Sequence, residues 1–328
     1  MRHRAASASG DQESFINTTA VVFEQPGQLS LATLDLTPPG EEDVVVDILW
    51  SGISTGTERL LWTGRMPSFP GMGYPLVPGY ESVGRVSEAG VRSGSTVGDT
   101  VFVAGAKCFG PVRGLFGGAA ARLVVPGSRA VPVAEHLGEH AVLLALAATA
   151  YHAICPTVIE HPDLIVGHGV LGRLLARLVV ATGGAAPTVW ETNAQRASGA
   201  EGYSVLDPAV DTRRDYRRIC DVSGDSAILD SVIARMAPGG EVVLAGFYSD
   251  PLSFAFSPAF MREARIRVAA QWVESDLKAV QSLAESGRLS LDGLITHRAE
   301  PADADAAYRT AFGDSACLKM ILDWRANT

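Results

Sequence analysis

The sequence lacks a long hydrophobic run and any cluster of basic residues. Its longest apolar stretches, at 141–153 and 174–181, are either shorter than the roughly 18 to 20 residues that cross a bilayer or interrupted by Arg177. The chain has 27 Lys and Arg against 36 Asp and Glu, a net charge of -9, so it repels a polyanion on average. These absences predict no transmembrane segment and no nucleic-acid partner.

Cysteine is scarce as well. Four cysteines are spread over 328 residues, and none has Cys-x-x-Cys spacing. That pattern suits neither a disulfide framework nor a zinc ribbon, so we expect a reducing, cytoplasmic environment. What is present, 47% hydrophobic and 19% charged residues, is typical of a folded protein with a core. The length favours about two domains.

Two kinds of pattern divide the chain. Residues 1–18 are polar and predict a flexible extension, whereas residues 19–136 show short β-type runs separated by turn dipeptides, which is typical of a β-barrel domain. Residues 137–296 alternate strands and helices, which indicates a doubly wound parallel sheet. Residues 297–328 should return to the first domain. The predicted fold class is α/β, with a β-barrel domain ahead of a doubly wound domain.

The main elements expected after the β-barrel domain follow from runs of apolar residues. Helices are predicted over Leu137–Ile154, Leu171–Thr182, Ser226–Met236 and Pro301–Phe312. Strands are predicted over Asp163–Val166, Pro187–Glu191, Cys220–Val222 and Glu241–Ala245, with a closing strand over Lys319–Asp323. Because the first four strands alternate with helices, they should lie parallel in one sheet.

The chain contains a dinucleotide-binding pattern. Residues 167–172 read G-x-G-x-x-G directly after an apolar strand and at the start of a helix. Gly167 allows a tight turn, Gly169 lets the backbone approach a pyrophosphate, and Gly172 allows close packing of helix and strand. Glu191, 19 residues beyond Gly172, would accept hydrogen bonds from ribose hydroxyls and repel a 2′-phosphate. NAD is therefore favoured over NADP, and Arg196 is the nearby cation that would soften the preference.

Other residues are expected around the same cofactor. Val170 and Leu171 lie in the first helical turn, whose free N–H groups carry about half a positive charge toward the phosphates. Ser223, Gly246 and Phe247 follow later strands of the sheet, so their backbones should border the ribose and nicotinamide. A glycine-rich turn in a sheet that binds no nucleotide is the competing explanation.

Landmarks of the first half resemble the medium-chain dehydrogenase/reductase superfamily. Gly56-Thr57-Glu58 is similar to the Gly-Thr-Asp that follows the first catalytic zinc cysteine of that superfamily, and the Pro-Gly-Tyr-Glu of residues 78–81 is similar to its Gly-His-Glu segment. Gly98-Asp99-x-Val101 and Gly117-Gly118 follow in order, and the resemblance spans residues 19–324. It implies a GroES-like β-barrel domain, a Rossmann domain and an NAD-dependent alcohol dehydrogenase.

The resemblance departs from the zinc-dependent members at the metal. Thr55 stands where they carry cysteine, Tyr80 stands where they carry histidine, and the third ligand position falls near Ala145. Zinc prefers thiolate, imidazole or carboxylate ligands, and hydroxyls are poor substitutes. The four-cysteine structural lobe is missing too, with only Cys108 in that region. We therefore expect no bound metal and a zinc-less branch of the superfamily.

A proline-rich run between residues 50 and 81 narrows the resemblance further. It is similar to pigment-pathway dehydrogenases, which oxidise the 3-(1-hydroxyethyl) group of a bacteriochlorophyllide to 3-acetyl with NAD in bacteriochlorophyll biosynthesis. Flat and polarizable side chains on a rigid backbone would line a wide apolar site for such a macrocycle. The expected substrate residues are Thr55, Trp62, Met66, Phe69, Met72 and Tyr74. Without the resemblance, a surface loop or a subunit contact explains the run equally well.

Without zinc, the hydroxyl proton of the carbinol must leave by another route. The resemblance places Thr57 at the hydroxyl proton-relay position, and Tyr80 would hydrogen-bond the same oxygen. With a reference pKa near 10, Tyr80 serves as a donor or needs a nearby cation before it acts as a base. Glu58 is expected to support these two catalytic hydroxyls.

Other functions stay open from the sequence. A zinc-less quinone or enone reductase would prefer NADPH, and a non-catalytic protein would bind NAD or a pigment without turnover. Gly52-x-Ser54-x-Gly56 spells a hydrolase nucleophile elbow, with His297 as a later histidine, but it lies in the β half. His136-x-x-Glu-His140 spells an inverted zinc-protease pattern that a glycine interrupts.

A homodimer and peripheral attachment to a photosynthetic membrane are further hypotheses.

Overall fold

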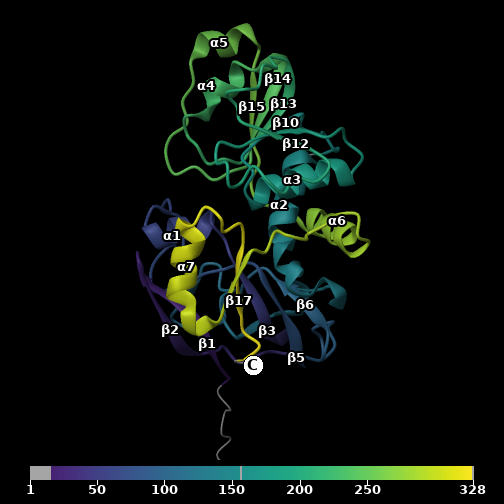
Figure 1. Ribbon diagram of the computed structural model, residues 1–328. Helices are drawn as coiled ribbons and strands as arrows, with labels where there is room; N and C mark the ends of the chain where they lie inside the picture. The colour runs from purple at the N-terminus through teal and green to yellow at the C-terminus, as the bar shows by residue number, and fades with distance from the viewer. Residues whose placement is uncertain (1–15, 156, 327–328) are drawn as a thin grey trace, which may run out of the picture.

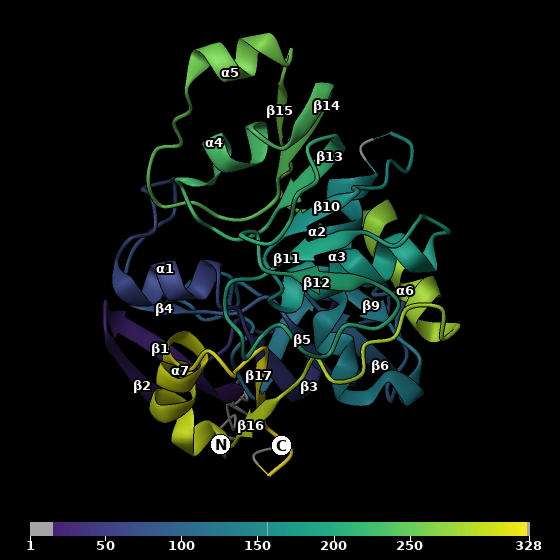
Figure 2. The same ribbon diagram turned by 45° about the horizontal axis from the view of Figure 1, so that its top comes forward.

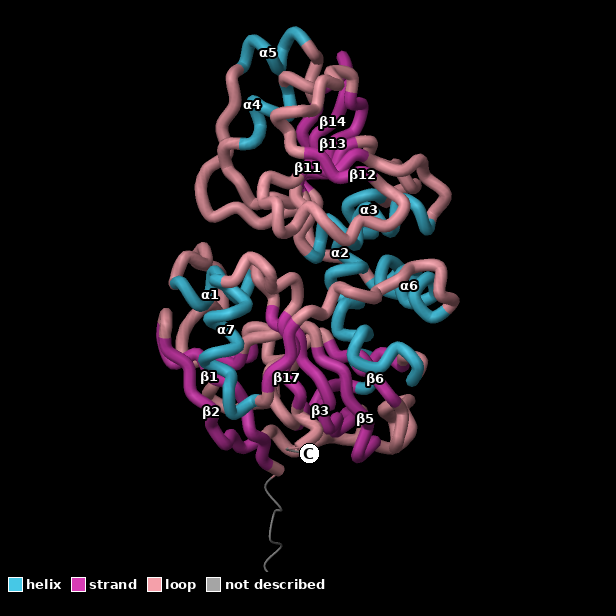
Figure 3. Tube along the Cα trace, viewed as in Figure 1, coloured by secondary structure: helices cyan, strands magenta, loops and turns pink. Residues whose placement is uncertain are grey.

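The structure is a computed structural model of the chain and describes residues 16–155 and 157–326. Two lobes lie one above the other, with α2 (Leu144–Ile154) between them (Figure 1). The lower lobe is rich in strands, and the upper lobe combines strands with helices (Figure 3). The predicted fold class, a β domain followed by a doubly wound α/β domain, is confirmed.

Two sheets form the lower lobe. The seven-stranded sheet has the order β16 (His297–Ala299), β17 (Met320–Asp323), β3 (Asp43–Ile53), β5 (Ser82–Ala89), β6 (Thr100–Val103) and β9 (Ala130–Pro132), with β8 (Arg122–Pro126) also paired with β3. The four-stranded sheet has the order β2 (Gln28–Asp35), β1 (Asn17–Gln25), β4 (Leu76–Val77) and β7 (Arg113–Gly114). Buried side chains of both sheets share one apolar core, which includes Phe23, Val46 and Trp324.

The C-terminal segment completes this lobe. The predicted closing strand is present as β17, which pairs antiparallel with β3 and sets Met320 opposite Ile53. Before it, η3 (Pro301–Asp303) leads into α7 (Ala304–Gly313), whose Tyr308 packs edge-on against Phe23 with 5.1 Å between ring centroids. Residues near both ends of the chain therefore share one core.

Two predicted boundaries need correction. β1 begins at Asn17, so Asn17 and Thr18 belong to a strand rather than to the extension predicted over 1–18; residues 1–15 of that extension lie outside the described part. The helix predicted over Leu137–Ile154 is kinked, because Gly138 adopts a φ of 49° inside the 3₁₀ segment η2 (Glu135–Leu143) that precedes α2. Glycine tolerates a positive φ, and this backbone conformation interrupts a regular helix.

The upper lobe contains one parallel sheet of six strands. Its order is β12 (Ser204–Leu206), β11 (Thr188–Trp190), β10 (Leu164–Val166), β13 (Tyr216–Asp221), β14 (Met236–Leu244) and β15 (Arg265–Val268) (Figure 2). The first strand in the sequence, β10, lies in the middle of the sheet. The chain then adds β11 and β12 toward one edge, returns to the middle with β13, and adds β14 and β15 toward the other edge. Ligands of such sheets bind beyond the carboxyl ends of the strands at this reversal, here between β10 and β13.

Helices cover both faces of this sheet. Ile165, Cys220 and Val243 point to the face that packs against α2, α3 (Val170–Ala181) and α6 (Glu274–Glu285). Their strand neighbours Leu164, Ile219 and Val242 point to the other face, toward α4 (Ile228–Ile233) and α5 (Phe256–Met261). Because both faces are buried, these strands are continuous apolar runs in the sequence.

One described stretch, Glu135–Ile154, is long and apolar enough to cross a membrane by length and composition. However, 67% of its most apolar window is buried inside the protein. It packs in the same core as α3 and α6. Its hydrophobicity is therefore explained by its place at the centre of the molecule.

Candidate active site

The glycine-rich turn joins β10 to α3 at the reversal point of the sheet. Gly167 has a φ of 103°, in the left-handed region that glycine tolerates, and its N–H donates to the Trp190 carbonyl at 2.9 Å. A Cβ on Gly172 would lie 1.9 Å from the Gly167 carbonyl oxygen. Only glycine at position 172 therefore lets α3 approach the turn this closely.

The N-terminus of α3 is open at Gly169, its N-cap. No side chain from the described residues caps the helix, and a Cβ on Gly169 would meet none of their atoms within 4 Å. Free N–H groups of the first turn, which includes Val170 and Leu171, therefore face open space. Such groups and the helix dipole attract anions, so this cradle fits the diphosphate of a dinucleotide.

Glu191 follows β11 and directs its carboxylate to the same turn. Oε2 accepts a hydrogen bond from the His168 N–H at 3.0 Å, and Oε1 accepts one from the Asn193 N–H at 2.8 Å. Each oxygen retains a lone pair for a ribose hydroxyl. The guanidinium of Arg196 donates to the Ser315 carbonyl at 2.8 Å and so is tied to the C-terminal segment.

Arg173, on α3, holds the loop that carries these residues, and the sequence analysis missed it. The side chain is 5% exposed. Its guanidinium donates, at 2.7 to 3.2 Å, to the backbone carbonyls of His168, Arg196, Ser198 and Gly199. The loop 191–203 forms no helix, so these bonds fix it in place of helix packing. The signal available in the sequence was a pair of arginines, Arg173 and Arg177, four residues apart in an otherwise apolar helix, because a buried charge needs partners.

On the other side of the reversal point, Asp221 ends β13 and is fully buried. It accepts hydrogen bonds from the Tyr248 hydroxyl and from the Ser223 N–H, the latter at 3.0 Å. Burial raises the pKa of Asp221. These bonds join the turns that carry Ser223, Gly246 and Phe247, the residues predicted beside the nicotinamide. Phe247 is 48% exposed and available for contact.

In the lower lobe, the two hydroxyls predicted for proton transfer, those of Thr57 and Tyr80, lie together with the hydroxyl of Ser54. Ser54 Oγ and Tyr80 Oη are 2.6 Å apart, and the Phe116 ring packs edge-on against Tyr80 with 5.7 Å between centroids. Burial, together with the charge of Glu81, raises the pKa of Tyr80, and hydrogen bonds with Ser54 and Thr57 oppose the rise only in part. Tyr80 is therefore a neutral hydroxyl at neutral pH.

Glu58, on α1 (Thr57–Thr63), is fully buried beside this pair. Its Oε1 accepts a hydrogen bond from the Ser54 N–H at 2.9 Å, and its Oε2 accepts one from the Tyr308 hydroxyl at 2.8 Å. Burial raises the pKa of Glu58 to about 8, and the charge of Glu81 adds to the rise. At neutral pH Glu58 is mostly protonated, and it holds Ser54 in place.

A buried ion pair links the same region to the C-terminal segment. Lys319 Nζ donates to Glu81 Oε2 at 2.6 Å and to the Ile53 carbonyl at 3.1 Å, and neither charged side chain is more than 1% exposed. A Cβ on Gly52 would lie 2.2 Å from Glu81 Oε2, so glycine leaves room for the carboxylate. No local pattern in the sequence points to Lys319, because its partner is 238 residues away.

The positions that carry zinc ligands in the zinc-dependent enzymes do not form a metal site here. Thr55 is half-buried, Tyr80 is bonded to Ser54, and Ala145 contributes only a buried methyl group. Within residues 16–155 and 157–326, no group of three or more His, Cys, Asp or Glu could hold a metal ion. Hydroxyl and methyl groups do not fit the ligand preference of zinc.

The predicted substrate residues separate into two groups. Trp62 is 9% exposed and packs against Phe23 and Tyr308, so it belongs to the core rather than to a substrate-facing surface. Helix α1, which the sequence analysis did not predict, turns this side chain inward. The other residues are exposed or half-buried. Thr55 lies in the turn between β3 and α1, and four lie in the loop after α1: Met66, Phe69, Met72 and Tyr74. The Tyr74 hydroxyl donates to the Leu61 carbonyl and fastens that loop to α1.

Packing explains the two motifs that suggested other chemistry. The hydroxyl of Ser54 meets Tyr80 rather than a histidine, and His297 Nδ1 is bonded to Thr296 Oγ1 at 2.9 Å. Between His136 and His140, the kink at Gly138 prevents the two imidazoles from sharing a helix face.

The lobes touch beside these groups. Arg65, just after α1, donates to Ser249 Oγ at 2.8 Å and to Asp250 Oδ2 at 3.0 Å, both beyond β14 in the upper lobe. α1 lies at the edge of the lower lobe that faces the upper one (Figure 1). The contact therefore brings the loop after α1 next to the turn that carries Phe247.

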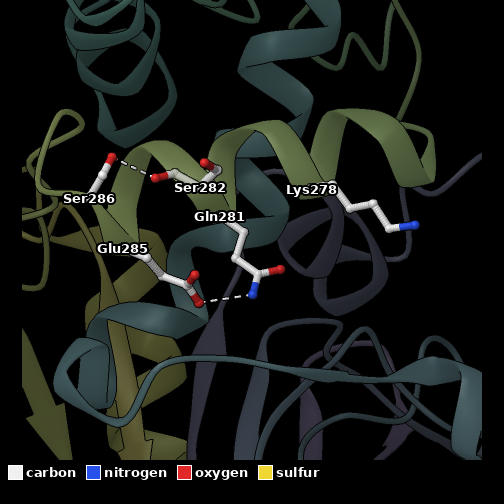
Figure 4. A pocket seen from close by; sticks show the side chains of 5 residues that line it. All are labelled: Lys278, Gln281, Ser282, Glu285 and Ser286. Carbon is white, nitrogen blue, oxygen red and sulfur yellow. Dashed lines mark hydrogen bonds between the residues drawn. The ribbon is translucent and has the colours of Figure 1, made fainter.

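A surface hollow on α6 lies apart from this region. It is lined by Lys278, Gln281, Ser282, Glu285 and Ser286 (Figure 4). Gln281 donates to the Pro132 carbonyl at 2.7 Å, and Glu285 accepts a hydrogen bond from the Ala134 N–H at 3.0 Å. These bonds tie α6 to the segment before η2, so Gln281 and Glu285 serve the packing of the helix.

Comparisons with known proteins agree with this architecture. Residues 40–135 match the model of the alcohol dehydrogenase GroES-like domain. Two relatives named 2-desacetyl-2-hydroxyethyl bacteriochlorophyllide A dehydrogenase are 57% identical to the chain: that of Cereibacter sphaeroides over 95% of this chain and 99% of its own, and that of Rhodobacter capsulatus over 94% and 99%. The solved structure of acetophenone reductase from Geotrichum candidum in complex with NAD matches at 19% identity with a TM-score of 0.78, covering 94% of this chain and 97% of that one.

A GroES-like domain joined to a Rossmann sheet with an open glycine-rich turn is the architecture of a medium-chain dehydrogenase/reductase, an oxidoreductase with a nicotinamide cofactor. Within that superfamily, the chain belongs to the family of the two bacteriochlorophyllide A dehydrogenases, since 57% of the aligned residues are identical over nearly its whole length. The predicted resemblance to this superfamily and to its bacteriochlorophyllide dehydrogenases is confirmed.

The two glycines of the turn should respond differently to alanine. In Gly172→Ala the new Cβ collides with the Gly167 carbonyl, so the protein should be destabilised by about 2 kcal/mol or more. Gly169→Ala should keep its unfolding free energy within about 1 kcal/mol, since the methyl enters open space, but should bind dinucleotide at least about tenfold more weakly. Denaturant unfolding and a fluorescence titration measure both; unchanged affinity in Gly169→Ala would contradict this placement of the diphosphate.

The pKa of Glu58 predicts a pH-dependent stability. Between its ordinary value of 4.5 and about 8, the folded state holds a proton that the unfolded state has lost. The contribution of Glu58 to the free energy of unfolding is complete below its unfolded pKa. It falls by up to about 1.4 kcal/mol per pH unit between the two pKa values and is gone once the pH has risen through about 8. Unfolding at pH 5 to 9 should show this slope in the parent protein and in the exposed control Glu88→Gln, but not in Glu58→Gln. Parallel profiles for all three would refute it.

Proposed function

We propose that the protein oxidises the 3-(1-hydroxyethyl) group of a bacteriochlorophyllide to 3-acetyl in bacteriochlorophyll biosynthesis, with NAD and without a bound metal. The observation that carries the proposal is 57% identity, over almost the whole chain, to two proteins named for that hydroxyethyl pigment. The lower-lobe site supports it, because a hydrogen-bonded pair of hydroxyls occupies the region where a zinc enzyme would present ligands.

Local charge favours NAD over NADP. Two backbone N–H groups hold the Glu191 carboxylate beside the glycine-rich turn, where it would accept ribose hydroxyls and repel a 2′-phosphate. Arg196 donates to the Ser315 carbonyl, which directs its guanidinium toward the C-terminal segment. Around the nicotinamide we propose Ser223, Gly246 and Phe247.

The substrate would lie against the loop after α1, near the hydroxyl pair. Met66, Met72 and Tyr74 pack their inner sides on the core and leave part of their surface free, while Phe69 is 37% exposed. Phe116, which contacts Tyr80 and is 39% exposed, adds a second flat surface that the sequence analysis missed. Apolar and polarizable groups of this kind suit a flat macrocycle.

Bound NAD supplies the acceptor for the hydride that leaves the carbinol carbon. Thr57 and Tyr80 would hydrogen-bond the carbinol oxygen, and the half-buried Thr57 would pass its proton outward to water. Ser54, 2.6 Å from Tyr80, would orient the Tyr80 hydroxyl. The ammonium of Lys319 is matched by Glu81, so it offers an alkoxide no unpaired positive charge. The conjugated ring of the substrate would instead spread the positive charge that develops as the hydride leaves.

We propose that a second copy of the chain covers the free edge of the six-stranded sheet. β15 lies at that edge, and the apolar side chains on and around it are unusually exposed for a folded protein: Phe256, Phe260, Met261, Ile266 and Val268. A hollow beside α5, lined in part by Phe254 and Phe256, would receive side chains of the partner. A cytoplasmic location is proposed as well, since all four cysteines are free thiols.

Removing either catalytic hydroxyl should slow the reaction. Tyr80→Phe and Thr57→Val should each lower kcat at least about tenfold while NAD affinity stays within about twofold, because the lost groups act on the carbinol and not on the cofactor. The control Tyr151→Phe removes a hydroxyl from α2 and should leave both quantities unchanged. Steady-state kinetics with an NAD titration give the two values; full turnover in both variants would overturn the assignment.

The function itself is tested by mixing the protein with NAD and 3-hydroxyethyl bacteriochlorophyllide. An acetyl group conjugated to the ring should shift the long-wavelength absorption band, at the same rate after chelator treatment and more slowly with NADP. Tight pigment binding without a shift would favour a binding protein. Reduction of an enone with NADPH, without pigment oxidation, would favour a quinone or enone reductase. Recovery of activity only after zinc is added would refute metal independence.

A further inference from the structure

Charge is distributed unevenly over the lower lobe. The chain has a net charge of -9, yet residues 59–80 and 100–134 contain no Asp or Glu. The basic residues of these two segments are Arg59, Arg65, Lys107, Arg113, Arg122 and Arg129. Arg65 pairs with Asp250, and Arg122 pairs with Asp47. The other four form no ion pair within residues 16–155 and 157–326, so they are available to an anion from outside the chain.

Among these four, Arg113 is held at the loop proposed to receive the substrate. Its strand β7 pairs with β4, and its guanidinium Nη1 donates to the Tyr74 carbonyl at 3.3 Å. A Cβ on Gly73 would lie 3.1 Å from the guanidinium carbon, so the group rests directly on the backbone of Gly73. One of its five N–H donors is used in this contact, and the guanidinium stays exposed.

Arg113 is also close to the catalytic hydroxyls. Phe116 follows it by three residues, which limits the distance between their Cα atoms to about 11 Å. The ring of Phe116 contacts the ring of Tyr80 at 5.7 Å between centroids. The upper limit that these steps set on the separation of Arg113 and Tyr80 is comparable with the width of a tetrapyrrole and one of its side chains. A single bound macrocycle can therefore reach both the hydroxyl pair and the guanidinium.

We propose that Arg113 binds the free propionate carboxylate of the tetrapyrrole substrate, an inference that rests on the proposed function. A chlorophyllide carries this acid unesterified, and a guanidinium is the side chain best matched to a carboxylate, through two parallel charge-assisted hydrogen bonds. Holding the acid at one edge leaves a flat ring few orientations, so the hydroxyethyl group is presented to Thr57 and Tyr80. Arg113 is thus a positioning and specificity residue that favours the acid over its esters.

The test compares the hydroxyethyl bacteriochlorophyllide with its propionate methyl ester. In Arg113→Gln, KM for the acid should rise about threefold to tenfold, with kcat nearly unchanged and KM for the ester equal to that of the parent protein. Arg113→Lys keeps the positive charge but loses the planar guanidinium, so its KM for the acid should lie between the values for the parent protein and for Arg113→Gln. Raising the ionic strength should weaken binding of the acid by the parent protein and leave the ester unaffected.

Arg129→Gln is the matched control. Arg129 also lies in the segment without acidic residues, and its guanidinium is bonded to the Ala104 carbonyl at 3.2 Å, so its loss should change neither KM. If Arg113→Gln raises KM equally for acid and ester, the residue only supports the loop and the proposal fails. It fails as well if KM for the acid is unchanged. If the parent protein oxidises neither pigment with NAD, the proposed function itself is wrong, which is a different result.

Discussion

The lower-lobe site depends on keeping the carboxyl groups of Glu58 and Glu81 out of water. Burying an unpaired carboxylate lowers the stability of the folded state by several kcal/mol, so each carboxyl group must be either paired with a cation or protonated. Glu81 has the ammonium of Lys319, and Glu58 keeps a proton near neutral pH while it is held by the Ser54 N–H and the Tyr308 hydroxyl. Lys319 and Tyr308 both belong to the C-terminal segment. The pairing of β17 with β3 therefore extends the sheet and also places Lys319, which precedes β17, beside Glu81.

In this arrangement the hydroxyl of Tyr80 stands where zinc-dependent members of the superfamily carry a ligand. Burial and the nearby charge of Glu81 both raise the pKa of Tyr80, so it remains a neutral hydroxyl beside Ser54. In the proposed reaction, the conjugated ring of the substrate takes over the charge stabilisation that a metal supplies elsewhere. The role of the chain is then to orient the pigment and move one proton.

The upper lobe provides a rigid cofactor platform by different means. The glycine-rich turn is set by local geometry, but the loop beside it is held by Arg173 through four carbonyl oxygens. Arg65 and Asp250 join this platform to the loop after α1 through exposed charges. Exposed pairs of this kind contribute about 1 kcal/mol or less, so the lobes can adjust around a bound substrate.

Residue spacing was enough to predict the strand–turn–helix at Gly167, the acidic residue at Glu191 and the change from β to α/β pattern, because each follows from neighbours in the chain. Short elements such as β12 and β15 escaped prediction since their side chains are partly exposed, and α6 was overlooked despite a helical apolar spacing. The core position of Trp62, the Phe116–Tyr80 contact and the Lys319–Glu81 pair were decided only by tertiary structure. They join residues 36 to 246 positions apart through strand register and helix packing, which no local pattern encodes.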